Sequence, residues 1–241
     1  MYETSPDAAT PFTPQGDWYA VQTTDQAAVL DAFGLDHPRR VALNDALRPW
    51  DIAYSDELLD ASGVLVTPAL DGWTLVFGYP DTENFHADRQ RWCTALSRSF
   101  GATHWYSLVE NGGCGDSDGW CLAERGALRR YVCRGGYGAD VLVGGAHPAE
   151  TGLLLDDVGD WLTANGFPDD LWTNYQYEGY RAGLPVETRW QRLQQHTGIP
   201  DLADSLTIAA RTSLSPARLS AATRVSGHAV LATPPRTLVP D

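Results

Sequence analysis

The chain has 241 residues, of which 43% are hydrophobic, and a formal net charge of −14 at pH 7. This hydrophobic content, with nine tryptophans, argues against general disorder, and the length suffices for one large domain. The surplus of carboxylates repels phosphate backbones and anionic lipid surfaces, so we expect neither nucleic acid nor a membrane as a partner.

The negative charge is distributed unevenly along the chain. Residues 1–185 contain 27 acidic residues against 11 arginines, whereas residues 186–241 contain 4 against 6. A positively charged partner would therefore be attracted mainly to the first part of the chain.

The N-terminal residues 1–16 contain three prolines and show no apolar periodicity. They predict a flexible arm ahead of a single α+β domain over residues 17–241. The first residues carry no apolar segment typical of a secretion signal, and no apolar run approaches 18 residues. We therefore expect a cytoplasmic protein whose cysteines are reduced.

The chain begins with a short strand and a helix. Residues 18–21 predict the strand, and Thr24 or Asp25 caps a helix that ends at Gly34. Residues 39–47 predict a second short helix before Pro49, and the acidic stretch 51–60 is interpreted as a solvent-exposed helix.

The central block, residues 63–146, contains most of the strand-like segments. Residues 64–67 and 73–77 are rich in β-branched and aromatic residues and are joined by a turn with Asp71-Gly72, which predicts two antiparallel strands. Residues 84–100 predict a helix ended by Gly101, and residues 103–109 and 141–143 predict further strands. A helix packed on an antiparallel sheet follows from this order.

A second hairpin is predicted around the turn Arg125-Gly126. A turn centred there places Trp120 opposite Tyr131. Cys121 then lies about three ladder positions, roughly 10 Å, from Cys133, which is beyond the reach of a disulfide. We expect both thiols to be free.

Two segments of this block resemble segments of uncharacterised actinobacterial proteins. They are residues 71–78 (DGWTLVFG) and residues 120–131 (WCLAERGALRRY). The resemblance covers about half of the chain and implies no activity, substrate or partner.

Residues 151–220 are predicted to be mainly helical, which gives a helical C-terminal quarter. Residues 229–232 are interpreted as a strand at the edge of the sheet. Within the helical part, residues 169–180 combine aromatic and acidic side chains that suit a recognition surface, although ordinary packing is an alternative. The candidate binding residues are Trp172, Tyr175, Tyr177, Tyr180, Asp169 and Asp170.

Motifs for metals, cofactors and covalent catalysis are incomplete. The cysteines are separated by 20, 6 and 11 residues, which matches no zinc knuckle, and the glycine-rich segments 112–115 and 135–138 lack the residues of a phosphate-binding loop. We expect no metal and no cofactor. His86 and His104 are the candidates for catalytic proton transfer, although each alone is typical of a surface or capping residue.

The sequence is compatible with two functions. The first is a non-catalytic interaction protein, such as an immunity-type or regulatory binder, that presents an acidic and aromatic surface to a basic protein. The second is an enzyme that tailors or isomerises a small molecule of bacterial specialised metabolism. Its pocket would be lined by Trp73, Trp105, Trp120 and Tyr131, with His86 or His104 transferring protons.

Overall fold

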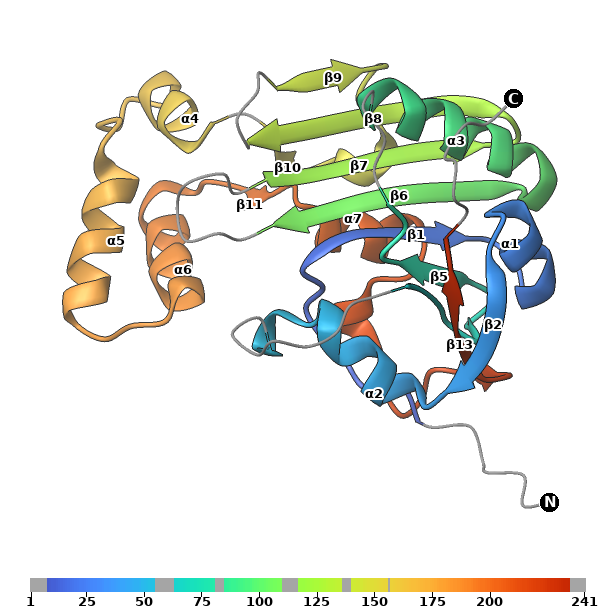
Figure 1. Cartoon of the computed structure of the whole chain (residues 1–241). Coiled ribbons are helices and arrows are strands. Elements are labelled where there is room, and N and C mark those ends of the chain that lie inside the picture. Colours follow the sequence, from blue (N-terminus) through green and yellow to red (C-terminus); the bar gives the residue numbers. More distant parts are fainter. Residues whose placement is uncertain are drawn as a thin grey trace. The chain divides into compact units, whose positions relative to one another are not determined.

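The computed structural model describes residues 8–54, 63–80, 85–109, 117–135, 140–155 and 157–234. The chain divides into two compact units (Figure 1). The first comprises Met1–His147 with Asp204–Asp241 and is called the sheet unit; the second, Pro148–Ala203, is called the helical unit. The prediction of a single domain over residues 17–241 stays a prediction.

The sheet unit is built on a nine-stranded antiparallel sheet with the order β2-β13-β3-β5-β1-β6-β7-β8-β9. Helices pack on it, which confirms the α+β class. The strands are β1 (Gly16–Val21), β2 (Asp36–Val41), β3 (Val64–Val66), β5 (Thr74–Phe77), β6 (Ala102–Val109), β7 (Ser117–Glu124), β8 (Ala127–Gly135), β9 (Val141–Val143) and β13 (Ala229–Thr233). A separate pair joins β4 (Ala69–Leu70) to β12 (Val225–Ser226).

Local signals place several of these elements correctly. Asp25 caps α1 (Gln26–Ala32) by accepting a hydrogen bond from the N–H of Ala28. The turn residues Asp71 and Gly72 have φ values of +50° and +91°, as the hairpin between β4 and β5 requires. Helix α3 (Phe85–Phe100) ends at Gly101, which has φ +85°.

Helices α3 and α7 (Ser205–Thr212) cover opposite faces of the sheet. Cys93 and Leu96 of α3 pack with Trp105 and Tyr131, whereas Thr212 of α7 bonds the hydroxyl of Tyr106, the neighbour of Trp105 in β6. Neighbouring residues of a strand point to opposite faces of the sheet, so one set of side chains packs under α3 and the other under α7. Both faces are filled by large aromatic side chains that are fully buried: Trp18, Trp105, Trp120, Tyr106 and Tyr131.

The short elements of the sheet unit lie outside the main sheet. They are α2 (Leu43–Leu47) and the 3-10 turns η1 (Arg48–Trp50), η2 (Ile52–Tyr54) and η4 (Pro216–Arg218). In the predicted arm, Phe12 is buried and its N–H donates a hydrogen bond to the carbonyl of Pro216. The backbone N–H of Gln15 donates to the carbonyl of Trp50. Residues 1–7 lie outside the described residues, as do residues 55–60 of the predicted acidic helix.

The predicted register of the second hairpin is wrong by one residue. The turn at Arg125-Gly126 is correct, but a bulge between the pairs Ala123–Leu128 and Leu122–Arg130 shifts the rest of the ladder. Trp120 therefore lies opposite Val132, and Cys121 lies opposite Tyr131. Cys121 and Cys133 are both free and lie two ladder positions apart.

Three further element predictions are corrected by long-range pairing. Residues 39–41 belong to β2 and not to a helix, because they pair with β13. Residues 153–154 form β10 (Leu153–Leu154), which pairs in parallel with β11 (Asp201–Leu202) and delays the predicted helix. Strand β13 lies between β2 and β3 and is therefore an interior strand, not an edge.

The helical unit contains α4 (Val158–Ala164), α5 (Leu171–Arg181) and α6 (Val186–Thr197), preceded by the 3-10 turn η3 (Pro148–Glu150). Its core is formed by Leu154, Leu162, Leu193 and Ile199. The last quarter of the chain is mixed, because β12 and β13 follow α6 and α7. Within the described ranges, none of the helices is both long enough and apolar enough to cross a membrane.

Candidate functional site

The predicted recognition segment forms helix α5, and the structure divides its aromatic residues between two sides. Trp172 packs edge-to-face on Trp190 of α6 with ring centroids 5.2 Å apart. The hydroxyl of Tyr175 lies 2.9 Å from Nδ1 of His196, also on α6. These two rings are partly buried and attach α5 to α6.

Tyr177 and Tyr180 lie on the outer side of the same helix. Their exposed fractions are 62% and 76%, the highest among the large hydrophobic side chains in the described part of the chain. The guanidinium of Arg181 lies over the Tyr177 ring, 5.6 Å from its centroid. Because residues three apart lie on one helix face, the two tyrosines form a contiguous aromatic surface.

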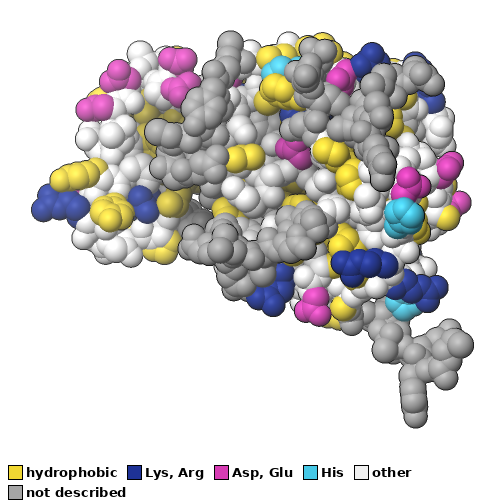
Figure 2. Space-filling view, viewed as in Figure 1, with side chains coloured by type: hydrophobic (Ala, Val, Ile, Leu, Met, Phe, Trp, Pro, Cys, Tyr) yellow, Lys and Arg dark blue, Asp and Glu magenta, His cyan; other side chains and the backbone are white. Residues whose placement is uncertain are grey.

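Acidic residues lie about two to three helical turns before the two tyrosines, at the start of the same helix. Asp169 and Asp170 are exposed directly before α5, and Asp160 is exposed on α4. Asp157 caps α4, accepting hydrogen bonds from the N–H groups of Gly159 and Asp160. Figure 2 shows acidic side chains gathered over α4 and the start of α5. We call Tyr177, Tyr180, Asp169 and Asp170 the tyrosine surface.

Arg189 fixes the hairpin that carries this surface. Its side chain crosses Gly179, where an added Cβ would lie 2.3 Å from Arg189 Cγ. Its guanidinium donates to the carbonyl of Leu184 at 3.0 Å and to the side-chain oxygen of Gln176 at 2.6 Å. The tyrosines are thus held on a helix whose inner side is anchored by packing and hydrogen bonds.

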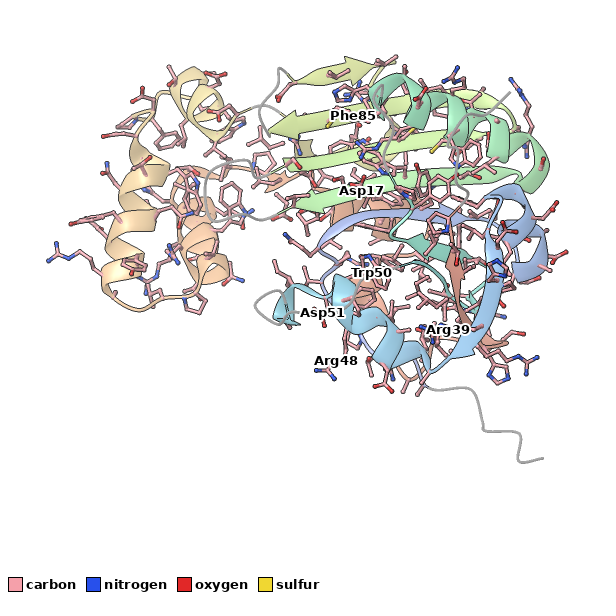
Figure 3. All side chains as sticks on the ribbon, viewed as in Figure 1. Asp17, Arg39, Arg48, Trp50, Asp51 and Phe85 are labelled. Carbon is pink, nitrogen blue, oxygen red and sulfur yellow. The ribbon has the colours of Figure 1, made fainter. Side chains whose placement is uncertain are left out.

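A second group of polar residues lies between α3 and the sheet. It consists of His86, Arg89, Asp17 and Tyr131 and is called the histidine cluster. Arg89 forms an ion pair with Asp17 and lies 4.1 Å from the centroid of the Trp105 ring. Nδ1 of His86 lies 2.6 Å from the hydroxyl of Tyr131. The Arg89 guanidinium also lies 4.9 Å from the centroid of the Phe85 ring. Asp17 and Phe85 are labelled in Figure 3.

Burial sets the protonation of both His86 and Tyr131. In their contact, the donor and acceptor roles depend on the tautomer of His86. Burial, followed by the charge of Arg89, lowers the pKa of His86, which favours the neutral ring. Burial also raises the pKa of Tyr131, which stays protonated.

His104 lies on the opposite face of the sheet in a polar network. Its Nδ1 is 3.1 Å from the hydroxyl of Tyr106, which also lies 2.7 Å from the hydroxyls of Thr212 and Ser213. Burial, followed by the charge of His147, lowers the pKa of His104 to about 3. His104 is 2% exposed, so its neutral ring is a structural component of the core.

The residues predicted to line a common pocket are divided between the two faces of the sheet. Trp105 and Tyr131 pack in the core under α3. Trp120 belongs to the other face, where Arg134 lies over its ring at 5.1 Å, and the Trp73 ring lies 5.5 Å from His104. His86 and His104 are therefore separated by the sheet.

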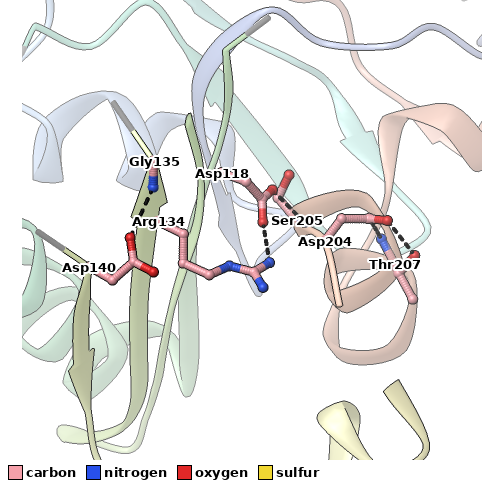
Figure 4. A network of polar contacts seen from close by, with 7 residues as sticks. All are labelled: Asp118, Arg134, Gly135, Asp140, Asp204, Ser205 and Thr207. Carbon is pink, nitrogen blue, oxygen red and sulfur yellow. Dashed lines mark hydrogen bonds and ion pairs between the residues drawn. The ribbon is translucent and has the colours of Figure 1, made fainter. Parts of the chain in front are cut away.

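An ion-paired network attaches α7 to the sheet. Asp118 accepts a hydrogen bond from the N–H of Ser205 at 2.8 Å and pairs with Arg134 at 2.9 Å (Figure 4). Asp204 caps the helix through the N–H of Thr207. Burial raises the pKa of Asp118, although Ser205 and Arg134 act in the opposite direction. Because these groups bond one another, the network is explained by its structural role.

Sequence reasoning missed Arg89 and Asp17. One signal was present: Arg89 lies four and seven residues before Cys93 and Leu96, on the apolar stripe of the predicted helix. An arginine on such a stripe requires a buried partner. Asp17, which lies 72 residues earlier, has no comparable signal in the sequence.

Comparison with protein-family models, with curated proteins and with solved structures finds no match for the chain. Function is therefore inferred from the geometry of the described residues.

Proposed function

We propose that the protein is a non-catalytic binder that uses the tyrosine surface of the helical unit to hold a basic protein. The observation that carries this proposal is the exposure of Tyr177 and Tyr180 on a helix whose opposite side is anchored. Tyrosine supplies a large contact area and loses few rotamers on binding, which is why it is enriched among residues that dominate binding energy. An immunity-type or regulatory role fits such a surface.

The charge of the helical unit supports a basic partner. Residues 148–203 contain nine carboxylates against three arginines, a formal charge of −6. Carboxylates at the rim of an interface accelerate encounter with a cationic surface and are screened by salt. The exposure of Asp169 and Asp170 at the start of α5 supports that role.

The filled interior of the sheet unit also supports a binder. Trp18, Tyr106 and Trp120 on one face and Trp105 and Tyr131 on the other are fully buried. Side chains thus occupy both faces where the small-molecule hypothesis requires a deep cavity.

The proposal is tested by affinity capture from the native lysate with two variants. Tyr177→Ser with Tyr180→Ser removes both rings, whereas Leu142→Ser removes an apolar side chain that is 53% exposed on β9 of the sheet unit. We expect the wild type and the Leu142 variant to retain the same basic protein, and the tyrosine variant to lose it. Retention should decrease as salt is raised. Equal capture by all three proteins would refute the proposal.

The histidine cluster favours a second candidate, an enzyme that transfers protons on a small molecule. The specific observation is the 2.6 Å contact between His86 and Tyr131, supported by Arg89. In this case the wild-type protein, added to the native lysate, would change the level of a metabolite. His86→Asn and Tyr131→Phe would abolish that change. If the wild type changes no metabolite, this candidate is excluded.

A further inference from the structure

A groove lies along the outer side of α3. It has a volume of about 800 Å³ and lies between Trp92 and Ala95 of α3 and Leu128 of β8, with Arg91 and Arg98 also in its lining. Among the described residues of its lining there is no carboxylate. These residues belong to the sheet unit and are distinct from both the tyrosine surface and the histidine cluster.

The position of Arg98 is set by the turn between β7 and β8. A Cβ added to Gly126 would lie 2.5 Å from Arg98 Cγ and 3.0 Å from its Nε, so the arginine crosses the turn where only glycine leaves room. The N–H of Gly126 donates to the hydroxyl of the buried Ser97 at 3.0 Å. The turn and the last part of α3 therefore hold each other in place.

The two arginines differ in their charge partners. Arg91 forms an ion pair with Asp88, one turn earlier on α3. Arg98 is exposed, and within the described residues it has no carboxylate partner. An anion in the groove would therefore meet one uncompensated guanidinium.

The apolar part of the groove has a rigid aromatic wall. The Trp92 ring stacks on Tyr79 with centroids 5.9 Å apart and an interplanar angle of 16°, and it packs edge-to-face on Phe33. Leu128 is supplied by β8 immediately after the same turn. The apolar wall and the cation thus occupy one groove.

We propose that this groove binds an amphipathic monoanion, a small molecule with an apolar chain or ring and a single carboxylate or sulfonate. The apolar part packs on Trp92, Ala95 and Leu128, and the anionic group pairs with Arg98. The volume lies within the usual range for small-molecule sites, about 300–1,000 Å³. A guanidinium is well suited to a carboxylate because it donates two parallel hydrogen bonds.

The test uses 8-anilinonaphthalene-1-sulfonate as a fluorescent probe, with decanoate and decanol as competitors. We expect saturable binding of the probe and displacement by decanoate at lower concentrations than by decanol. Arg98→Gln should weaken decanoate binding about two- to fivefold and leave decanol binding unchanged, because one exposed ion pair is lost. Leu128→Ser should weaken both competitors.

Arg192→Gln is the matched control, since it removes an exposed arginine from α6 in the helical unit. It should bind both competitors like the wild type. The melting temperature of each variant verifies that it is folded. The proposal is overturned if decanoate fails to displace the probe, or if folded Arg98→Gln binds decanoate as tightly as the wild type does. Neither result depends on the protein partner of the tyrosine surface.

Discussion

The buried His104 predicts a loss of stability in mild acid. Its pKa is lowered from 6.5 to about 3, and its side chain lies in the core beside Tyr106. The unfolded chain binds a proton at this residue below pH 6.5, whereas the native state binds it only near pH 3. The contribution of His104 is therefore fully present above pH 6.5 and is lost as the pH falls toward about 3.

The magnitude follows from the width of this interval. Each pH unit is equivalent to about 1.4 kcal/mol, so the loss amounts to about 2.7 kcal/mol at pH 4.5 and approaches about 5 kcal/mol near pH 3. The side chain is 2% exposed, so solvent screening reduces these values little. Losses of this size are a large part of the stability of a typical domain.

The assay is urea unfolding followed by tryptophan fluorescence at pH 7 and at pH 4.5. His104→Asn keeps a polar atom near Tyr106 and removes the titration, so its free energy of unfolding should fall about 2.7 kcal/mol less between the two pH values than that of the wild type. Comparing the two proteins cancels the contributions of Asp118 and His86.

His37→Asn is the control because His37 is exposed and has φ +53°, which asparagine tolerates. It should show the pH dependence of the wild type. If His104→Asn loses as much stability as the wild type between pH 7 and pH 4.5, the reasoning about the buried imidazole is refuted.

Three further predictions concern packing. Gly78→Ala should lower the free energy of unfolding by about 2–4 kcal/mol, because its φ is +74° and the new Cβ would lie 2.7 Å from the Trp50 ring. Gly72→Ala, with φ +91° and open space around the new Cβ, should lower it by about 1 kcal/mol. Equal losses for the two variants in chemical denaturation would contradict this reasoning. Gln26→Ala should cost about 1–3 kcal/mol by the same assay, since its Nε2 donates to the carbonyls of Val66, Thr67 and His228, and a loss near zero would count against these bonds. A thiol reagent should label the partly exposed Cys133 faster than the buried Cys93 and Cys121, as measured by mass spectrometry. Labelling of all three cysteines at the same rate would disprove the core packing.

Local chemistry in the sequence was sufficient for much of the fold. Asp25 and Gly34 bound the first helix because capping depends on neighbouring residues, and Asp71-Gly72 and Arg125-Gly126 turn the chain because both residues of each pair adopt positive φ. Helix α3 was predicted for the same reason, since its apolar stripe and the glycine at its end are both features of neighbouring residues in the sequence.

Long-range pairing explains the remaining errors. Arg39 is in a strand because it pairs with Leu231, which is far away in the sequence. The bulge at Arg129 does not alter the turn at Arg125-Gly126, but it changes the cross-strand partner of Trp120 from Tyr131 to Val132. A local pattern contains neither fact.

The candidate sites were predicted in part for similar reasons. Helical spacing alone would separate Trp172 and Tyr175 from Tyr177 and Tyr180, but the side that meets α6 is decided by Trp190 and His196. His86 was named as a proton-transfer candidate, and its partner Tyr131 is 45 residues away on another element.

The most direct test of the tyrosine surface is hydrogen exchange of the protein with the basic partner recovered by affinity capture. The account predicts that the complex slows exchange in peptides covering residues 169–186, and that Tyr180→Ser weakens binding about 30-fold. Protection confined to peptides of the sheet unit, with binding unchanged in Tyr180→Ser, would contradict it.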